Sequence, residues 1–284
     1  SFSIKILKYR VQAYSEINLW KQCALPFLSK KEAWNNLFWQ IIKQREISSS
    51  QGWAGNVFCD GSVAMSALHR PSNFLLLSHG RLGAVEALAK YAKQNKWEVK
   101  GLSGPETVVR NFLKSMQRYA PLPCSPAIRA FKLFKTQTFK MNKKFDDYTL
   151  CSVSHLDWAR VRVWAQKFAL EADPPMDLSA ITQMARKLNK EKNLFTLNDP
   201  QNYPCAMAGF GRSTERFRVI NLVYVPKDLR GYGIGRELIS RMTFHARTMG
   251  YEECILFSEW QGKYNMYESM GCKELGNFAE YDLS

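Results

Sequence analysis

Residues 221–238 of the chain read NLVYVPKDLRGYGIGREL. An apolar strand pattern runs directly into a turn and then into an amphipathic helix pattern that reaches Thr248. Three glycines occupy alternate positions of the turn: Gly231, Gly233 and Gly235. Without Cβ atoms, they allow several backbone N–H groups to approach one anion, and the positive end of the following helix attracts negative charge. Arg230 and Arg236 add cationic side chains, so the segment predicts a phosphate-binding loop.

The spacing of these glycines excludes two common nucleotide-binding loops. The dinucleotide motif Gly-x-Gly-x-x-Gly fails in both registers, because Arg236 or Leu238 stands where the last glycine is needed. The nucleoside-triphosphate loop needs Gly-Lys-Ser/Thr, whereas Gly235 is followed by Arg236 and Glu237. The pattern that fits is Arg-x-x-Gly-x-Gly, at Arg230, Gly233 and Gly235. It resembles the acetyl-CoA pyrophosphate loop of the GNAT superfamily of N-acetyltransferases.

The flanking sequence extends this resemblance. A strand pattern at Val219–Val225 precedes the loop, and another at Cys254–Ser258 follows the helix. Residues 265–271 resemble the closing helix of the family, with Tyr-x-x-x-Gly at Tyr267 and Gly271. Two departures are the short spacing from Asn265 to Tyr267 and a cysteine directly after Gly271. The chain also resembles a GNAT subgroup that carries a second, degenerate GNAT-like domain in front.

The resemblance implies an acetyl-CoA site, with acetyl-CoA as cosubstrate. In the family, the strand before the loop separates from its neighbour, binds the pantetheine through its backbone and directs an N–H group at the thioester oxygen. Asn265 would contact the pantetheine or cap the turn. The implied cofactor-binding residues are Val223, Tyr224, Val225, Arg230, Gly231, Tyr232, Gly233, Ile234, Gly235, Arg236 and Asn265.

Two residues are candidates for proton transfer during direct acetyl transfer to an amine in a ternary complex. Tyr267 matches the family position that protonates the departing thiolate, and a phenol of pKa near 10 can serve a thiol of pKa near 8.5. The alternative for Tyr267 is packing in the core. Glu259 follows a strand end, where a carboxylate either takes the ammonium proton or is simply solvated.

The charge distribution divides the 284-residue chain. Residues 1–140 contain 21 Lys and Arg against 7 Asp and Glu, a net charge of +14, and residues 141–284 contain 19 against 18. We predict a degenerate GNAT-like domain over residues 1–142 and an acetyl-CoA-binding GNAT domain over residues 143–284. A basic front half favours an acidic partner or is a solvated surface, and it has no compact basic block of the kind that binds nucleic acid.

The predicted fold class is α/β of the α+β type, with two GNAT-like domains, each a mixed, mostly antiparallel sheet flanked by helices. In front, helices are expected at Tyr14–Phe27 and Lys31–Gln44, and a hairpin is expected around Asp60-Gly61. A strand at Asn73–Ser78 stands where the loop-preceding strand should be. Because the residues after it lack the Arg-x-x-Gly-x-Gly spacing, we expect that the front domain keeps the fold and has lost cofactor binding.

Composition limits the remaining possibilities. No apolar run approaches the roughly 18 residues that cross a bilayer, and the start lacks a signal-peptide pattern, so we expect a soluble cytoplasmic protein without a membrane partner. Seven scattered cysteines and four scattered histidines lack metal-ligand spacing, and we expect free thiols and no metal. The expected partner is an amine-bearing acceptor, a small molecule or a protein, and not nucleic acid. Homo-oligomerisation is left open.

Two alternatives stand beside the enzyme hypothesis. The chain could be a non-catalytic CoA-binding sensor or scaffold whose basic N-terminal half binds an acidic partner. It could also transfer an acyl group other than acetyl. The presence of both Tyr267 and the complete loop favours an enzyme over a sensor.

Overall fold

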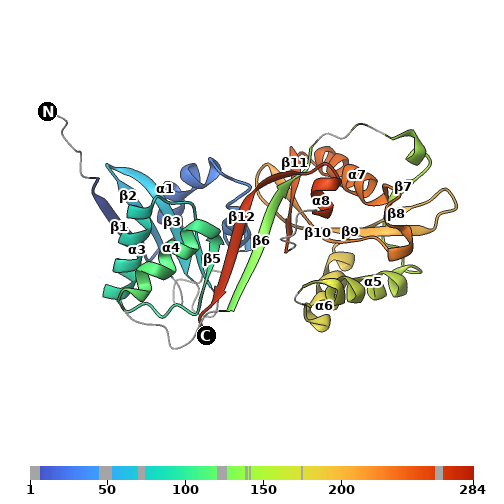
Figure 1. Ribbon diagram of the computed structural model, residues 1–284. Coiled ribbons are helices and arrows are strands. Elements are labelled where there is room, and N and C mark those ends of the chain that lie inside the picture. The colour runs from blue at the N-terminus through green and yellow to red at the C-terminus, as the bar shows by residue number, and fades with distance from the viewer. Residues whose placement is uncertain are drawn as a thin grey trace. The chain divides into compact units, whose positions relative to one another are not determined.

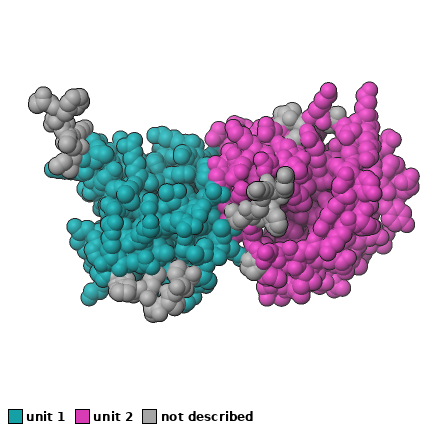
Figure 2. Space-filling view, viewed as in Figure 1, with its two compact units in different colours: residues 1–130, 277–284 teal, residues 131–276 magenta. Residues whose placement is uncertain are grey.

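The computed structural model describes residues 7–44, 53–69, 74–119, 127–137, 140, 142–173, 175–259 and 265–284. The chain forms two compact units (Figure 2): unit 1 comprises residues 1–130 with 277–284, and unit 2 comprises residues 131–276. This division differs from the one predicted between residues 142 and 143. The physical reason is strand pairing, because one strand from each half of the chain completes the sheet of the other unit.

Unit 1 is a six-stranded sheet in the order β1-β2-β3-β4-β5-β12, with β4 and β5 parallel and the other described neighbours antiparallel (Figure 1). Its elements are β1 (Tyr9–Tyr14), α1 (Ile17–Ser29), α2 (Asn36–Gln44), β2 (Trp53–Cys59), β3 (Ser62–His69), β4 (Leu75–Leu77), α3 (Leu82–Gln94), β5 (Gly101–Pro105), α4 (Glu106–Gln117) and most of β12 (Lys273–Asp282).

Helices cover both faces of this sheet because successive strand residues point to opposite sides. Leu75 and Leu77 of β4 face a core shared with α3 and α4, whereas Leu76 faces a second core under α1 and α2. β12 pairs with β5 from Phe278 opposite Pro105 to Asp282 opposite Gly101, so the end of the chain belongs to this sheet.

Unit 2 is a sheet in the order β6-β11-β10-β9-β8-β7, with β10 and β11 parallel and the other described pairs antiparallel. Its elements are the end of β6 (Ala127–Lys135), the 3-10 turn η1 (Lys143–Phe145), β7 (Thr149–Ser152), α5 (Trp158–Glu171), α6 (Leu178–Lys190), β8 (Leu194–Asn198), β9 (Pro204–Ser213), β10 (Phe217–Tyr224), the 3-10 turn η2 (Lys227–Leu229), α7 (Ile234–Thr248), β11 (Glu253–Ser258) and α8 (Met266–Ser269).

Two cores hold unit 2 together. One face of the sheet packs against α7 and α8, and this core includes Phe134, Phe145, Leu238 and Tyr267. The other face packs against α5 and α6 through residues that include Trp164. None of the helices in the described part of the chain combines the length and apolar character needed to cross a membrane.

Several sequence predictions for the front half are corrected by the structure. The hairpin is confirmed, with positive φ angles of 49° at Asp60 and 83° at Gly61. The helix predicted from Tyr14 begins at Ile17, because Tyr9–Tyr14 forms the unpredicted strand β1 along β2. The helix predicted from Lys31 begins at Asn36. Of the predicted strand Asn73–Ser78, the described residues retain only Leu75–Leu77.

The half-buried His79 gives unit 1 a testable pH dependence. Its ring packs edge-on against Trp34 at 4.6 Å between ring centroids. Burial lowers the pKa of His79 to about 4, with the positive charge of Lys31 as the smaller cause. The unfolded chain therefore binds more protons at this residue than the folded chain below about pH 6.5. The contribution of the neutral ring to the free energy of unfolding is lost as the pH falls from about 6.5 to about 4.

We expect His79→Gln to remove the pH-dependent contribution of this residue to the free energy of unfolding. Between pH 6.5 and 4, the free energy of unfolding should fall by about 2 kcal/mol more in the natural protein than in the variant. Urea unfolding at a series of pH values measures both curves, and parallel curves would contradict the expectation.

Candidate functional site

The strand before the glycine loop is bulged. Between Asn221 opposite Gly209 and Tyr224 opposite Met207, β10 advances three residues while β9 advances two. Leu222 takes up the extra residue with a φ angle of 54°, an uncommon conformation for a side chain other than glycine. The bulge changes the direction of the backbone at Val223, Tyr224 and Val225, the residues that the resemblance assigned to pantetheine binding.

The same strand separates from its parallel neighbour. β10 pairs with β11 from Phe217 opposite Glu253 to Val219 opposite Ile255, and the described residues show no further pairing between these strands. On its other edge, β11 pairs with β6 from Ile255 to Ser258. The N–H and C=O groups at the end of β10 are therefore released from the ladder on this side, which leaves them available to an extended ligand.

The loop has the backbone that its glycines predict. Gly231 and Gly233 have φ angles of 85° and 87°, in the left-handed region that favours glycine. A Cβ on Gly231 would meet nothing within 4 Å, and one on Gly233 would lie 3.6 Å from the Phe145 ring. Gly233 is also the N-cap of α7 and has no side chain to satisfy the first N–H groups of the helix. This helix end can accept an anion.

Gly235 has a different role from the other two glycines. A Cβ at this position would overlap the end of the Met270 side chain and would lie 3.5 Å from Val225. Its small size therefore lets the segment after α8 pack directly on the first turn of α7. Ile234, the first residue of α7, is buried in the same core.

One arginine of the loop, Arg230, is oriented by hydrogen bonds. Arg230 donates from Nε to the Val225 carbonyl at 2.8 Å and from Nη2 to Oε2 of Glu171 at 2.6 Å. Tyr224 donates its hydroxyl to Oε1 of Glu171 at 3.3 Å. Glu171, at the end of α5, therefore fixes the cation that the sequence assigns to phosphate, while Arg236 lies exposed on the first turn of α7.

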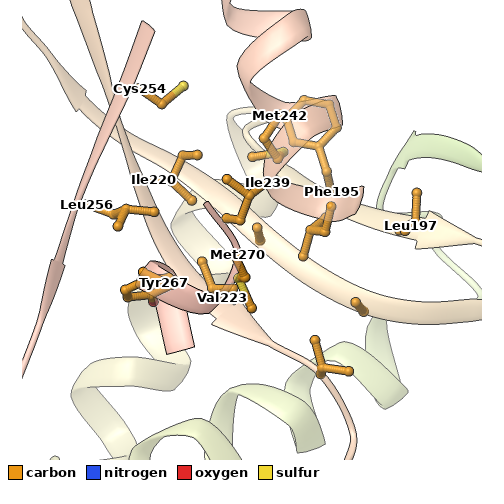
Figure 3. Packing of buried hydrophobic residues seen from close by; sticks show 14 of the residues in the cluster. Phe195, Leu197, Ile220, Val223, Ile239, Met242, Cys254, Leu256, Tyr267 and Met270 are labelled. Atoms are coloured by element: carbon orange, nitrogen blue, oxygen red, sulfur yellow. The ribbon is translucent and has the colours of Figure 1, made fainter. Parts of the chain in front are cut away.

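Tyr267 and Asn265 lie at the end of the separated strands. Asn265 accepts from the Tyr267 N–H at 2.8 Å and donates to Ser258 Oγ at 2.9 Å, so it caps α8 and joins it to the end of β11. Tyr267 packs edge-on against Phe134 of β6 and lies near Val223 and Met270 (Figure 3). Burial raises the pKa of Tyr267 far above its usual range, with Cys272 as a smaller cause, so its phenol stays protonated at neutral pH.

Glu259 directly follows β11 and is half-buried. Because β10 and β11 are parallel, their carboxyl ends lie at the same edge of the sheet. The structure therefore brings Glu259, the end of β10, the glycine loop and α8 to one edge of unit 2. Cys254 and Cys272 are buried thiols whose pKa values burial raises to about 12, as expected for core residues and not for nucleophiles.

Sequence reasoning missed two residues that touch the loop. Glu171 holds Arg230, and Lys144 donates to the Tyr232 carbonyl at 3.3 Å. Both are distant from the loop in sequence, and no local motif marks them. Lys144 lies directly after the domain boundary that the sequence predicts between residues 142 and 143.

Unit 1 repeats the topology of this edge but not its loop. β4 and β5 are parallel, and only Ser78–Arg81 separates β4 from α3. A Cβ on Gly80 would lie 2.8 Å from Met65 Sδ, and one on Gly83 would overlap the Tyr9 ring. The space beside these glycines is therefore filled by side chains of unit 1 itself.

The bulged strand, left-handed glycine turn and open helix end define unit 2 as an α/β domain with a loop suited to phosphate. Residues 158–272 match the model of the Acetyltransferase (GNAT) family. This part of unit 2 is therefore similar to a family whose members use acetyl-CoA as cosubstrate. No curated protein shows a significant sequence match to the chain.

Solved structures extend the likeness to almost the whole chain. A GNAT-family acetyltransferase from Colwellia psychrerythraea is 13% identical, with 97% of this chain and 100% of that one covered and a TM-score of 0.55. A GCN5-related N-acetyltransferase from Sphaerobacter thermophilus is 14% identical, with 96% and 95% covered and a TM-score of 0.56. A Drosophila protein is 8% identical, with 95% and 97% covered and a TM-score of 0.56. The predicted fold of two GNAT-like domains is confirmed.

Proposed function

We propose that unit 2 binds acetyl-CoA and transfers the acetyl group directly to an amine acceptor in a ternary complex. The observation that carries the proposal is the bulged and separated end of β10, which leads into the left-handed glycine turn and the open N-terminus of α7. The released backbone of Val223–Val225 would bind the pantetheine. The first N–H groups of α7 would bind the pyrophosphate.

The residues at this edge suit the chemistry of transfer. A backbone N–H at the end of β10 would stabilise the negative charge that develops on the thioester oxygen. An ammonium acceptor with a pKa near 10 must lose a proton, and Glu259 is the carboxylate that we assign to this step, directly or through water. Tyr267, at the carboxyl ends of the separated strands, would return the proton of its phenol to the CoA thiolate. Asn265 would position Tyr267 through the cap of α8.

We assign no cofactor to unit 1. Its glycines at 80 and 83 are packed against Met65 and Tyr9, whereas Gly231 of unit 2 faces open space. The short connection Ser78–Arg81 also leaves less backbone to surround an anion than the segment between β10 and α7. We therefore propose one acetyl-CoA site in the chain, in unit 2.

Calorimetric titration of the purified protein with acetyl-CoA tests the site, and thiol release over a panel of polyamines, amino acids and peptides tests the transfer. Saturable binding with acceptor-dependent thiol release is expected. Binding without release for any amine would favour the non-catalytic sensor, and no binding at millimolar acetyl-CoA would overturn the proposal.

We expect Tyr267→Phe to lower turnover about 100-fold while the Kd for acetyl-CoA changes less than threefold. The variant keeps the ring that packs against Phe134 and removes only the hydroxyl. Single-turnover kinetics at several pH values would measure the effect. Unchanged turnover would assign proton return to solvent or to another group.

A further inference from the structure

Hydrogen bonds from Arg241 hold the segment before β7 against α7, beside the glycine loop. Arg241 donates to the Phe145 carbonyl at 2.7 Å and to the Tyr148 carbonyl at 2.8 Å, and Glu237 accepts from the same guanidinium at 2.7 Å. Phe145 is only 2% exposed, and its ring lies 3.6 Å from the Cβ position of Gly233. The backbone of residues 143–145 therefore has a fixed position next to the loop.

From this fixed backbone, the side chain of Lys144 extends and brings one ammonium group to the loop. Lys144 Nζ donates to the Tyr232 carbonyl at 3.3 Å and lies 5.8 Å from the centre of the Tyr232 ring. The Lys144 N–H donates to Asn142 Oδ1 at 3.0 Å, which fixes the turn from which the side chain extends. Tyr232 is followed directly by Gly233, the N-cap of α7, so the ammonium lies close to the proposed pyrophosphate position.

Arg230 and Lys144 differ in their partners. Arg230 is paired with the Glu171 carboxylate, which offsets its positive charge. Among the described residues, Lys144 contacts a neutral carbonyl and aromatic rings and forms no ion pair. An ammonium has three donors, and one bond to a carbonyl leaves two for a ligand. Lys144 also lies before residue 158, where the family match begins, so the match does not include it.

We propose that Lys144 is a phosphate-binding residue that adds a positive charge to the acetyl-CoA site of unit 2. The inference rests on the proposed function and extends it to a residue of the segment before the family domain. The phosphate is either the pyrophosphate or the 3′-phosphate of CoA, because both present oxygen anions that an ammonium binds through charge-assisted hydrogen bonds.

The test compares Lys144→Gln with Lys143→Gln in the 284-residue chain. Both changes remove one positive charge from the same exposed turn, and only Lys144 reaches the loop in the described contacts. Calorimetric titration with CoA and with dephospho-CoA at low and high salt gives the affinities, and thermal unfolding checks that both variants fold. We expect Lys144→Gln to weaken CoA binding about tenfold at low salt and less at high salt, with Lys143→Gln within twofold of the natural protein.

The two ligands separate the sources of the phosphate. Equal weakening toward CoA and dephospho-CoA supports contact with the pyrophosphate, and weakening toward CoA alone supports contact with the 3′-phosphate. If both lysine variants bind both ligands alike, the inference is overturned while the proposed function stands. If the natural protein binds neither ligand, the proposed function itself fails.

Discussion

Gly233→Asp is expected to abolish CoA binding, with a Kd at least about 100-fold higher than that of the natural protein. The substitution places a negative charge at the N-cap of α7, where the pyrophosphate would lie. It also forces a side chain onto a backbone with a φ angle of 87°, at a cost of roughly 1–2 kcal/mol. Calorimetric titration with CoA measures the first effect, and urea unfolding measures the second.

Gly250→Asp is the matched control. Gly250 follows the other end of α7, has a φ angle of 96°, and would place a Cβ in open space. The control therefore imposes the same kind of backbone strain and the same charge change away from the loop. We expect it to lose stability and to keep its affinity for CoA. Equal affinity in the two variants would remove the loop from the proposed site.

The sequence predicted best what depends on neighbouring residues. The sequence patterns of residues 178–190 and 194–198 predict a helix and a strand, and α6 and β8 have these bounds, Leu178–Lys190 and Leu194–Asn198. Asp177 caps this helix by accepting from the Ala180 N–H at 2.6 Å. The glycine turn is also a local feature, because the positive φ angles at Gly231 and Gly233 are a requirement that the residue types reveal.

Long-range contacts were the part that the sequence did not reveal. Tyr9–Tyr14 pairs along the edge of β2, although residues 9–13 alternate between apolar or aromatic and polar side chains and so carried a short local strand signal. Glu171 and Lys144 reach the loop through tertiary packing, and one carboxylate or ammonium in a helix or linker has no distinguishing pattern. For the same reason, the sequence offered a cap as one of two roles for Asn265, whose side chain does cap α8, and gave no sign of its bond to Ser258.

The domain boundary was missed for a related reason. The net charge of the chain changes near residue 140, but the choice of which strands pair does not depend on the net charge of the segments that contain them. Residues 132–135 of β6 pair with residues 255–258 of β11 in unit 2, and residues 278–282 of β12 pair with residues 101–105 of β5 in unit 1. The two halves of the sequence therefore each contribute a strand to the other half.

A fragment of residues 143–284 is accordingly expected not to fold into a stable CoA-binding domain. It lacks β6, which covers the edge of β11 and supplies the fully buried Phe134. It also lacks Thr136, whose N–H and hydroxyl donate to the Cys254 carbonyl at 2.9 and 3.2 Å. The loss of one such buried aromatic side chain costs about 3–5 kcal/mol, a large part of the stability of a domain of this size.

A fragment of residues 127–276 is the comparison, because it restores β6 and omits the part of β12 that pairs with β5. We expect this fragment to unfold cooperatively and to bind CoA, whereas the 143–284 fragment should lack a thermal transition in circular dichroism. Phe134→Ala in the full-length chain isolates the packing contribution, since it removes the ring that supports Tyr267 and leaves the β6 backbone in place. If the 143–284 fragment melts and binds like the longer one, β6 is dispensable, and Tyr267 keeps its position through α8 and the Asn265 cap alone.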